Sequence, residues 1–269
     1  MRPLSRVLIV SLFLVSVVPI RAEDQSTPER DAHRLKMRQV AESFQISVKE
    51  EAVAAKLAAE PLFRYTDATR RLHESALWLW GTKGRPVAVM AIEFYPKQPK
   101  NTPWLFEIVS LSAERIRAKH TTDLDWLAEK PGVAFRDLPD AGVPADRPTL
   151  RLAQMRQLMR RFTANETAVI EGRIELRPMA NALHRYDDAT LKVIDGAIFA
   201  FANGTNPEVF VLLEAQSVAG GPPTWKYSLA QMTGGSVAVS VDGNEVWSCK
   251  EADPPAVRPS YVNGWLRLE

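Results

Sequence analysis

This chain has few of the residues that hold a fold together by anything other than packing. Cys249 is its only cysteine, so no internal disulfide can form, and the fold must rest on its apolar core. The histidines are His33, His73, His120 and His184, and no two of them have the spacing of metal ligands on one helix. We therefore expect neither a zinc site nor a cofactor.

Patterns typical of catalysis are also missing. No Gly-x-Ser-x-Gly nucleophile elbow occurs, and nothing around Ser248 and Cys249 indicates an activated thiol. Asp123 and Asp125 resemble the start of a calcium loop, but the glycine and the terminal glutamate of such a loop are absent. These absences favour a protein that binds over one that catalyses.

Neither sign of charge dominates the chain. Its formal net charge is +2, and removal of the first 22 residues, which contain three arginines, changes this to about −1. Nucleic-acid binding requires a clustered basic surface, and the sequence does not indicate one. With 46% hydrophobic and 25% charged residues, the composition is that of a globular protein with a substantial core.

Long hydrophobic runs are absent beyond the N-terminus. The longest covers residues 7–20, after Arg2 and Arg6 and before Glu23. About 14 residues are short for a membrane span of roughly 20. The order of charge, apolar run and acidic start is that of a secretory signal peptide. We predict a signal peptide over residues 1–22 and an exported protein of the periplasm or cell exterior, with no membrane span after cleavage; an uncleaved anchor is the alternative.

The mature chain repeats itself at a spacing of about 121 residues. Residues 64–69, Arg-Tyr-Thr-Asp-Ala-Thr, recur as residues 185–190, Arg-Tyr-Asp-Asp-Ala-Thr. The same offset aligns Trp78 with Phe199, Trp80 with Phe201, Glu93 with Glu214, Trp104 with Trp225 and Trp126 with Trp247. Upstream, residues 37–44 match residues 155–162 at an offset of 118. Self-similarity of this kind indicates a duplicated structural unit.

Each copy begins with a predicted helix. In the second copy, residues 151–162 carry one apolar stripe at steps of three and four, which is typical of an amphipathic helix. The stripe consists of Leu152, Met155, Leu158, Met159 and Phe162. In the first copy, Leu35, Val40 and Phe44 form the corresponding stripe over residues 29–44.

Strands follow each helix. Residues 197–202 and 209–215 are apolar runs around the turn cluster Asn-Gly-Thr-Asn-Pro at 203–207, which predicts a hairpin. Residues 77–80 and 87–94 form the corresponding hairpin of the first copy. In the second copy a further turn is predicted at Asp242 and Gly243. Short turns require antiparallel pairing.

These patterns predict an α+β fold, in which each copy packs its N-terminal helix on an antiparallel β-meander of about four or five strands. The first copy is assigned to residues 23–130 and the second to residues 151–269. Residues 131–150 are rich in proline and are predicted to be a linker without regular structure. Both faces of the sheets carry apolar residues, so we expect the copies to pack on each other. The pattern leaves open whether they form one continuous sheet or two domains.

Over most of its mature length the chain resembles a set of uncharacterised exported proteins of planctomycete-type bacteria. The residues that carry the resemblance are Arg185 and Tyr186 with Asp188, residues 195–199, residues 203–208 and residues 151–161. The resemblance implies export and a duplicated fold. It implies no activity, because that family has none that can be named.

The most distinctive local pattern is Arg-Tyr-x-Asp, and both copies contain it. The residues are Arg64, Tyr65 and Asp67 in the first copy and Arg185, Tyr186 and Asp188 in the second. A guanidinium, a phenol and a carboxylate at this spacing are able to hold a carboxylate or sugar hydroxyls, so we name them as candidate binding residues. The structural alternative is that each aspartate caps the following turn.

Two hypotheses for function follow. In the first, the protein is an exported binding or accessory protein that recognises a protein or small-molecule ligand through the surface between the two copies. In the second, it is a hydrolase whose site uses Glu93, Glu214, Asp67 or Asp188, because paired carboxylates carry out glycoside hydrolysis at about 5 to 9.5 Å separation. His184, beside Arg185, is the best single candidate for a base.

Overall fold

The computed structural model of the protein describes residues 27–49, 54–67, 71–97, 102–121, 124–168, 172–250 and 257–266. The signal peptide expected over residues 1–22 lies outside the described residues. Within them, no helix has both the length and the apolar character that crossing a membrane requires.

The fold class predicted from the sequence is wrong. Among the described residues 51% lie in strands and 13% in two helices, so this is a β-rich fold of large curled antiparallel sheets and not a helix on a small meander. The prediction failed because it missed the strands that directly follow the helices. Phe44 and Phe162, which the helical stripes included, are the first residues of strands.

The first copy builds one helix and two sheets. Its elements are α1 (Pro28–Ser43), β1 (Phe44–Val48), β2 (Phe63–Asp67), β3 (Leu72–Trp80), β4 (Ala88–Phe94), β5 (Trp104–Ser110), β6 (Ile116–His120) and β7 (Asp125–Leu127). Strands β2 to β5 belong to a 6-stranded sheet, and β1, β6 and β7 form a 3-stranded sheet. The Thr27 side chain caps the start of α1 by accepting from the Arg30 N–H at 3.3 Å, which satisfies an otherwise unpaired helix donor.

The second copy joins its corresponding strands into one 9-stranded sheet. Its elements are α2 (Pro148–Met159), β9 (Phe162–Ala168), β10 (Gly172–Pro178), β11 (His184–Asp188), β12 (Val193–Asn203), β13 (Asn206–Gln216), β14 (Thr224–Gln231), β15 (Ser236–Val241) and β16 (Asn244–Cys249). The predicted hairpin is confirmed as β12 and β13, and the predicted Asp242–Gly243 turn joins β15 to β16. Both turn residues have the positive φ that such a two-residue turn requires.

Strand pairing recurs between the copies in the same register. Arg64 pairs with Ala76 in the first copy, and Arg185 pairs with Ala197 in the second, 121 residues later. The bulge that follows Tyr65 also follows Tyr186. In the β1–β6 and β9–β15 pairs the partners likewise match at the offsets of 118 and 121 found in the sequence. This agreement supports the duplication, because register is set by which side chains must face the core.

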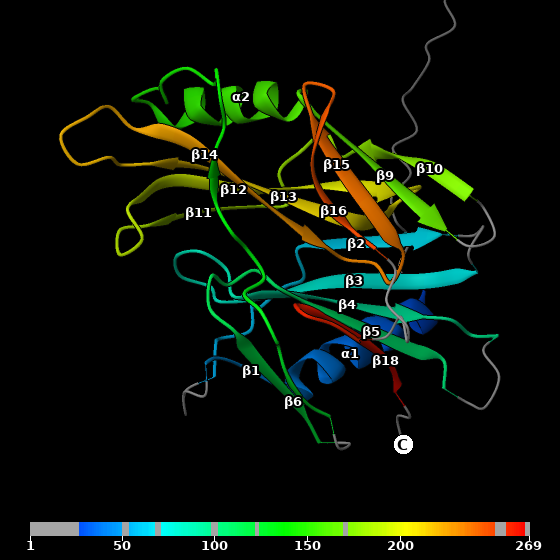
Figure 1. Ribbon diagram of the computed structural model, residues 1–269. Helices are drawn as coiled ribbons and strands as arrows, with labels where there is room; N and C mark the ends of the chain where they lie inside the picture. Colours follow the sequence, from blue (N-terminus) through cyan, green and yellow to red (C-terminus); the bar gives the residue numbers. More distant parts are fainter. Residues whose placement is uncertain are drawn as a thin grey trace, which may run out of the picture.

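The two copies stack face to face. Figure 1 shows α1 and α2 on opposite outer sides, with the 6-stranded and 9-stranded sheets between them. One buried cluster lies under each helix, and a third lies between the sheets, where Leu77 and Leu79 of the first copy meet Ile198 and Phe210 of the second. Both sheet faces are therefore apolar, as expected. The facing surfaces form a shared core.

Tail segments of each copy pair with the sheet of the other. Strand β18 (Tyr261–Leu266), preceded by β17 (Val257–Arg258), follows the second copy but pairs with β5 of the first. Strand β8 (Arg136–Asp137) follows the first copy but pairs with β14 of the second. The segment predicted to be an unstructured linker thus contributes a short strand, and its Val133 and Leu138 are buried. This exchange ties the copies together by backbone hydrogen bonds as well as by the core.

Two of the three residues predicted on the apolar stripe of the first copy, Val40 and Phe44, are buried, and the third is not. Leu35 was expected on the apolar stripe, but it is 59% exposed, while Met37, Val40 and Ala41 are buried. The buried stripe is carried by residues 37, 40, 41 and 44, whose steps of three and four exclude position 35. In α2 the predicted stripe holds for Met155, Leu158 and Met159, which are buried.

Candidate functional site

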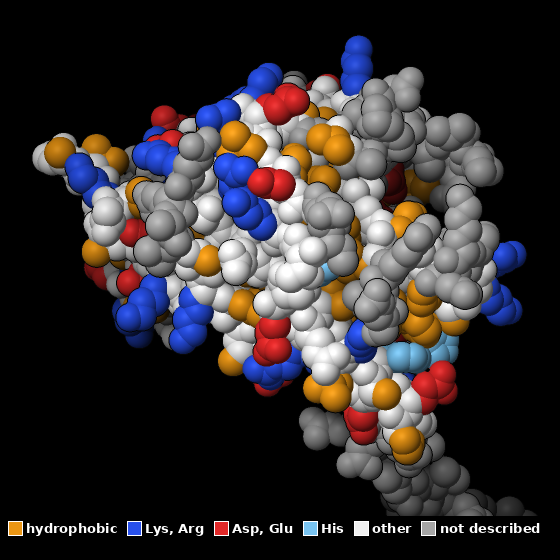
Figure 2. Space-filling model, turned by 90° about the horizontal axis from the view of Figure 1, so that it is seen from below, with side chains coloured by type: hydrophobic (Ala, Val, Ile, Leu, Met, Phe, Trp, Pro, Cys, Tyr) orange, Lys and Arg blue, Asp and Glu red, His pale blue; other side chains and the backbone are white. Residues whose placement is uncertain are grey.

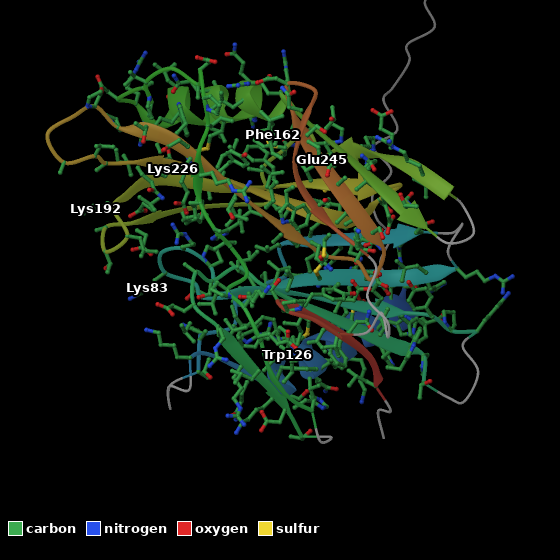
Figure 3. The ribbon with its side chains drawn as sticks, in the orientation of Figure 1. Lys83, Trp126, Phe162, Lys192, Lys226 and Glu245 are labelled. Carbon is green, nitrogen blue, oxygen red and sulfur yellow. The ribbon has the colours of Figure 1, made fainter. Side chains whose placement is uncertain are left out.

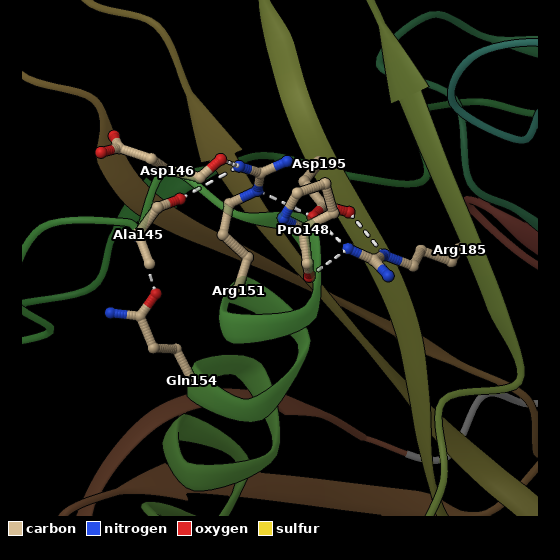
Figure 4. Close-up of polar contacts among 7 residues, drawn as sticks. All are labelled: Ala145, Asp146, Pro148, Arg151, Gln154, Arg185 and Asp195. Atoms are coloured by element: carbon tan, nitrogen blue, oxygen red, sulfur yellow. Dashed lines mark hydrogen bonds and ion pairs between the residues drawn. The ribbon is translucent and has the colours of Figure 1, made fainter.

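A cluster of two arginines around one aspartate lies where the start of α2 meets β11 and β12 (Figure 4). Arg151 Nε donates to Asp195 Oδ2 at 2.8 Å, and Arg185 donates to the same carboxylate through Nε at 2.8 Å and Nη2 at 2.5 Å. The side chains of Arg151 and Asp195 are 8% and 5% exposed. The hydrogen bond that Arg185 donates to Asp195 raises the pKa of Arg185, although partial burial opposes this shift. The Arg185 guanidinium therefore stays charged.

Backbone carbonyls hold the remaining arginine nitrogens in place. Arg151 Nη1 donates to the carbonyls of Ala145 and Asp146 at 3.0 and 2.6 Å, and Arg185 Nη2 donates to the carbonyl of Pro148 at 2.6 Å. These hydrogen bonds orient the two guanidinium planes. The carbonyl acceptors carry no net charge, so they do not neutralise the arginines. The cluster therefore keeps one positive charge more than Asp195 neutralises.

The helix end adds to this positive potential. Arg151 lies in the first turn of α2, where the aligned peptide dipoles act as a partial positive charge. That turn contains no acidic residue, and no side chain caps it. Arg151 Nη2 and Arg185 Nη1 have no hydrogen-bond partner within the described part of the chain. Two oriented donors in an electropositive setting are a geometry that recognises carboxylate, sulfate or phosphate.

The cluster forms one wall of an open depression with a volume of about 660 Å³. The depression is lined by Pro148, Arg151, Arg185, Tyr186, Asp187, Ala189, Lys192, Val193, Ile194, Asp195 and Ser217. Lys192 lies at the outer end of the β11–β12 turn (Figure 3), with a φ of 60°, and it has no ion pair among the described residues. Ile194 is 38% exposed and adds an apolar surface beside the charged wall.

The first copy carries a related cluster that is closed. Glu74 replaces Asp195 there, and Arg34 Nε donates to it at 3.3 Å while His33 Nδ1 lies 3.4 Å from its other oxygen. His33 occupies the position of Arg151, and its ring lies 4.1 Å from the Phe94 ring, centroid to centroid. The rings of His33 and Phe94 thus occupy the region that Arg151 and Ala215 occupy in the second copy.

The carboxylate of Glu214, a candidate for hydrolysis, is fully engaged in structural contacts. Arg85 of the first copy donates to both of its oxygens at 2.7 Å, Tyr186 donates to Oε1 at 2.7 Å, and Gln216 donates to Oε2 at 2.6 Å. Glu214 is 0% exposed. Burial, with the Glu214 charge and hydrogen bond, raises the pKa of Tyr186 well above its ordinary value. Tyr186 therefore stays protonated and serves as a donor.

Glu93, the equivalent residue of the first copy, is also buried. Tyr65 donates to Oε1 and Tyr95 to Oε2, both at 2.7 Å, and Glu93 is 1% exposed. Burial, with the nearby Glu93, raises the pKa of Tyr65 well above its ordinary value. Both glutamates therefore act as acceptors for buried tyrosines inside the molecule.

The aspartates of the repeated motif are the last residues of β2 and β11 and contact the other copy. Asp188 Oδ1 accepts from the Leu191 N–H at 3.1 Å and so caps its turn, as the structural alternative expected. Its other oxygen accepts from the Arg85 N–H at 3.0 Å. Asp67 is 8% exposed and lies against Gly204 of the second copy, and next to it the Thr205 hydroxyl donates to the Thr66 carbonyl. Both aspartates thus help to join the two copies.

Of the six candidate binding residues, only Arg185 and Tyr186 line the depression. Sequence reasoning missed Arg151, Lys192 and Asp195 as site residues. A signal for Arg151 was present, because it lies four residues before Met155 and therefore on the apolar side of α2, where a charge needs a buried counter-ion. His184, the candidate base, has its pKa lowered by burial, and its ring stacks on Tyr186 at 6.1 Å.

The described residues contain no group of three or more His, Cys, Asp or Glu side chains placed to hold a metal ion. Neither a protein-family model, nor a curated protein, nor a solved structure matches this chain.

Proposed function

We propose that this protein is an exported binding protein that holds the anionic group of a small ligand in the depression beside α2. The observation that carries the proposal is the sharing of Asp195 by Arg151 and Arg185 on the wall of an open hollow. Two guanidiniums share one carboxylate there. With Lys192, the lining carries three basic side chains against the two carboxylates of Asp187 and Asp195, which leaves one positive charge in excess.

The lining also indicates the shape of the ligand. The exposed flank of Ile194, with Ala189 and Val193, provides an apolar surface beside the donors. A small organic acid therefore fits better than a bare inorganic anion. Asp187 also lines the depression, and its negative charge disfavours a ligand with two adjacent negative charges.

The contacts of Glu93 and Glu214 argue against a hydrolytic function. Both carboxylates are buried and hydrogen-bonded, and a substrate bond has no access to them. The face shown in Figure 2 has Lys and Arg side chains interspersed with Asp and Glu, a mixture that does not favour a nucleic-acid ligand on that face.

Isothermal titration calorimetry with butyrate, acetate, sulfate and phosphate tests the proposal. Butyrate should bind more tightly than acetate, and its affinity should fall as salt is added. Lys192→Gln should weaken binding about threefold to tenfold, because one exposed charge contributes modestly. Arg185→Lys should weaken it more, because lysine cannot keep both the Asp195 bonds and a donor to the ligand.

The matched control is Lys36→Gln, which removes one lysine from α1 on the opposite side of the molecule (Figure 1). It should leave butyrate binding unchanged. Equal affinities of the parent protein, Lys192→Gln and Arg185→Lys for butyrate would refute the proposal, as would the absence of binding by every probe.

A further inference from the structure

A second hollow lies on the other half of α2, between that helix and β10. Its volume is about 620 Å³, within the range of about 300 to 1,000 Å³ that small-molecule sites occupy. It is lined by Arg156, Met159, Arg160, Phe162, Thr163, Glu175, Leu176, Pro178, Met179, Ala180, Phe199 and Phe201. We refer to these residues as the α2–β10 groove. None of them lines the depression that contains Lys192.

The floor and walls of the groove are apolar and adaptable. Phe199 and Phe201 of β12 form part of its lining, and Met159 and Met179 stand on α2 and after β10. Methionine side chains are unbranched and polarizable, so they adapt to ligands of varied shape. Burial of a flexible hydrocarbon chain against such walls is favoured because it removes apolar surface from water.

The rim of the groove carries an unusual pair of charges. Arg156 in the last turn of α2 and Arg160 at its C-cap are four residues apart, a spacing at which like charges repel each other. Arg156 donates to the neutral Asn181 side chain at 3.3 Å. Neither arginine forms an ion pair within the described part of the chain. An anion placed between them would remove the repulsion.

The equivalent positions of the first copy carry different residues. There Arg38 and Glu42 stand in place of Arg156 and Arg160, and they form an ion pair at 2.9 Å. Below them, Trp78 and Trp80 stand in place of Phe199 and Phe201, and all four rings are 1% exposed. The second copy thus has smaller rings in the floor and an excess of positive charge on the rim.

We propose that the α2–β10 groove binds an apolar monocarboxylate of the medium-chain fatty-acid type. The chain lies against the phenylalanine and methionine side chains, and the carboxylate lies between Arg156 and Arg160. Glu175, which also lines the groove, repels a second negative charge and so favours a ligand with a single carboxylate.

Calorimetric titration with decanoate, below the concentration at which it forms micelles, tests this site. One decanoate should bind per chain, and decan-1-ol should bind about tenfold or more weakly, because a charge-assisted contact contributes that much. Arg160→Glu, which installs the charge found in the first copy, should weaken decanoate binding at least about tenfold. The control Arg173→Glu makes the same charge change at an exposed position of β10 outside the groove and should have no effect.

Phe201→Trp tests the apolar part of the site. It places the first copy's residue in the floor, and it should abolish decanoate binding while thermal unfolding of the free variant stays cooperative. Lys192→Gln separates this site from the depression, because it should leave decanoate binding unchanged while it weakens butyrate binding. Unchanged decanoate affinity in Arg160→Glu, or loss of decanoate binding in Lys192→Gln, would overturn the proposal.

Discussion

The guanidinium of Arg85 and the carboxylate of Glu214 form a two-pronged ion pair across the boundary between the two copies. Nε lies 2.7 Å from Oε1, and Nη2 lies 2.7 Å from Oε2. The side chains are 8% and 0% exposed, and the Arg85 guanidinium also lies 4.1 Å above the centre of the Phe135 ring. One residue from a loop of the first copy therefore neutralises the most buried charge of the second.

Arg85→Met should destabilise the protein by about 3 to 5 kcal/mol, because it leaves Glu214 buried without its counter-ion. Urea unfolding followed by tryptophan fluorescence measures this. The double variant Arg85→Met with Glu214→Gln should recover much of the loss, because neither buried charge remains. A double variant that is less stable than Arg85→Met would show that the ion pair is not the reason for the loss.

Trp225→Ala should cost about 3 to 5 kcal/mol, because the ring is 1% exposed and belongs to the cluster under α2. Trp265→Ala is the matched control, since that ring is 45% exposed, and it should change stability by about 0.5 kcal/mol or less. Both values come from urea unfolding. Similar losses for the two variants would show that exposure does not determine the effect.

Gly196→Ala should disturb the Tyr186–Glu214 contact. A Cβ at position 196 would lie 2.5 Å from the Tyr186 ring, closer than any real contact, so the ring must move from its hydrogen bond. We expect a loss of about 1 to 3 kcal/mol. Gly221→Ala, whose added Cβ would meet only Val218 at 3.8 Å, should stay within about 0.5 kcal/mol of the parent protein. Equal stabilities of the two variants would contradict this packing.

Stability should fall as the pH is lowered below about 6.5, the ordinary pKa of histidine. Burial lowers the pKa values of His120 and His184 in the folded protein, so the unfolded chain binds protons more readily than the folded one. Their contribution is complete above the unfolded pKa and is lost as the pH falls through the folded pKa. Urea unfolding at pH 7.5 and pH 5.5 measures the loss.

His120→Gln should show a smaller loss between these two pH values than the parent protein. His120 Nε2 lies 2.8 Å from Ser43 Oγ, and glutamine is able to keep a hydrogen bond there without titrating. The same pH dependence in the parent protein, in His120→Gln and in His184→Gln would show that neither histidine carries the effect.

Local features of the fold were predictable because they depend on neighbours in the chain. The Asp242–Gly243 turn follows from the ease with which those two residues adopt positive φ. Trp104 and Trp225, at equivalent positions of the two copies, are both buried, whereas of the next equivalent pair Trp126 is buried and Trp247 is only partly buried. The fold class was not predictable in this way, because β1 and β9 directly extend helical patterns, and the exchanged strands β8 and β18 pair with sequence-distant partners.

The candidate site shows the same division. The Arg-Tyr-x-Asp pattern identified Arg185 and Tyr186 as notable, but their surroundings depend on which elements pack beside β11. Only the position of α2 brings Arg151 to the other side of Asp195. In the first copy the same motif leads to a closed cluster, because α1 presents His33 and Arg34 to Glu74.

By itself, the sequence determined where the chain resembles itself, where the turns of its hairpins lie and that the apolar runs of its strands avoid water, because these properties follow from residue type and spacing. The tertiary structure decided that the repeats stack through a shared core, that their tails exchange, and that Glu93 and Glu214 lie inside. The physical reason is that a buried charge is stable only beside a partner, and for Glu214 that partner, Arg85, lies 129 residues away in the chain.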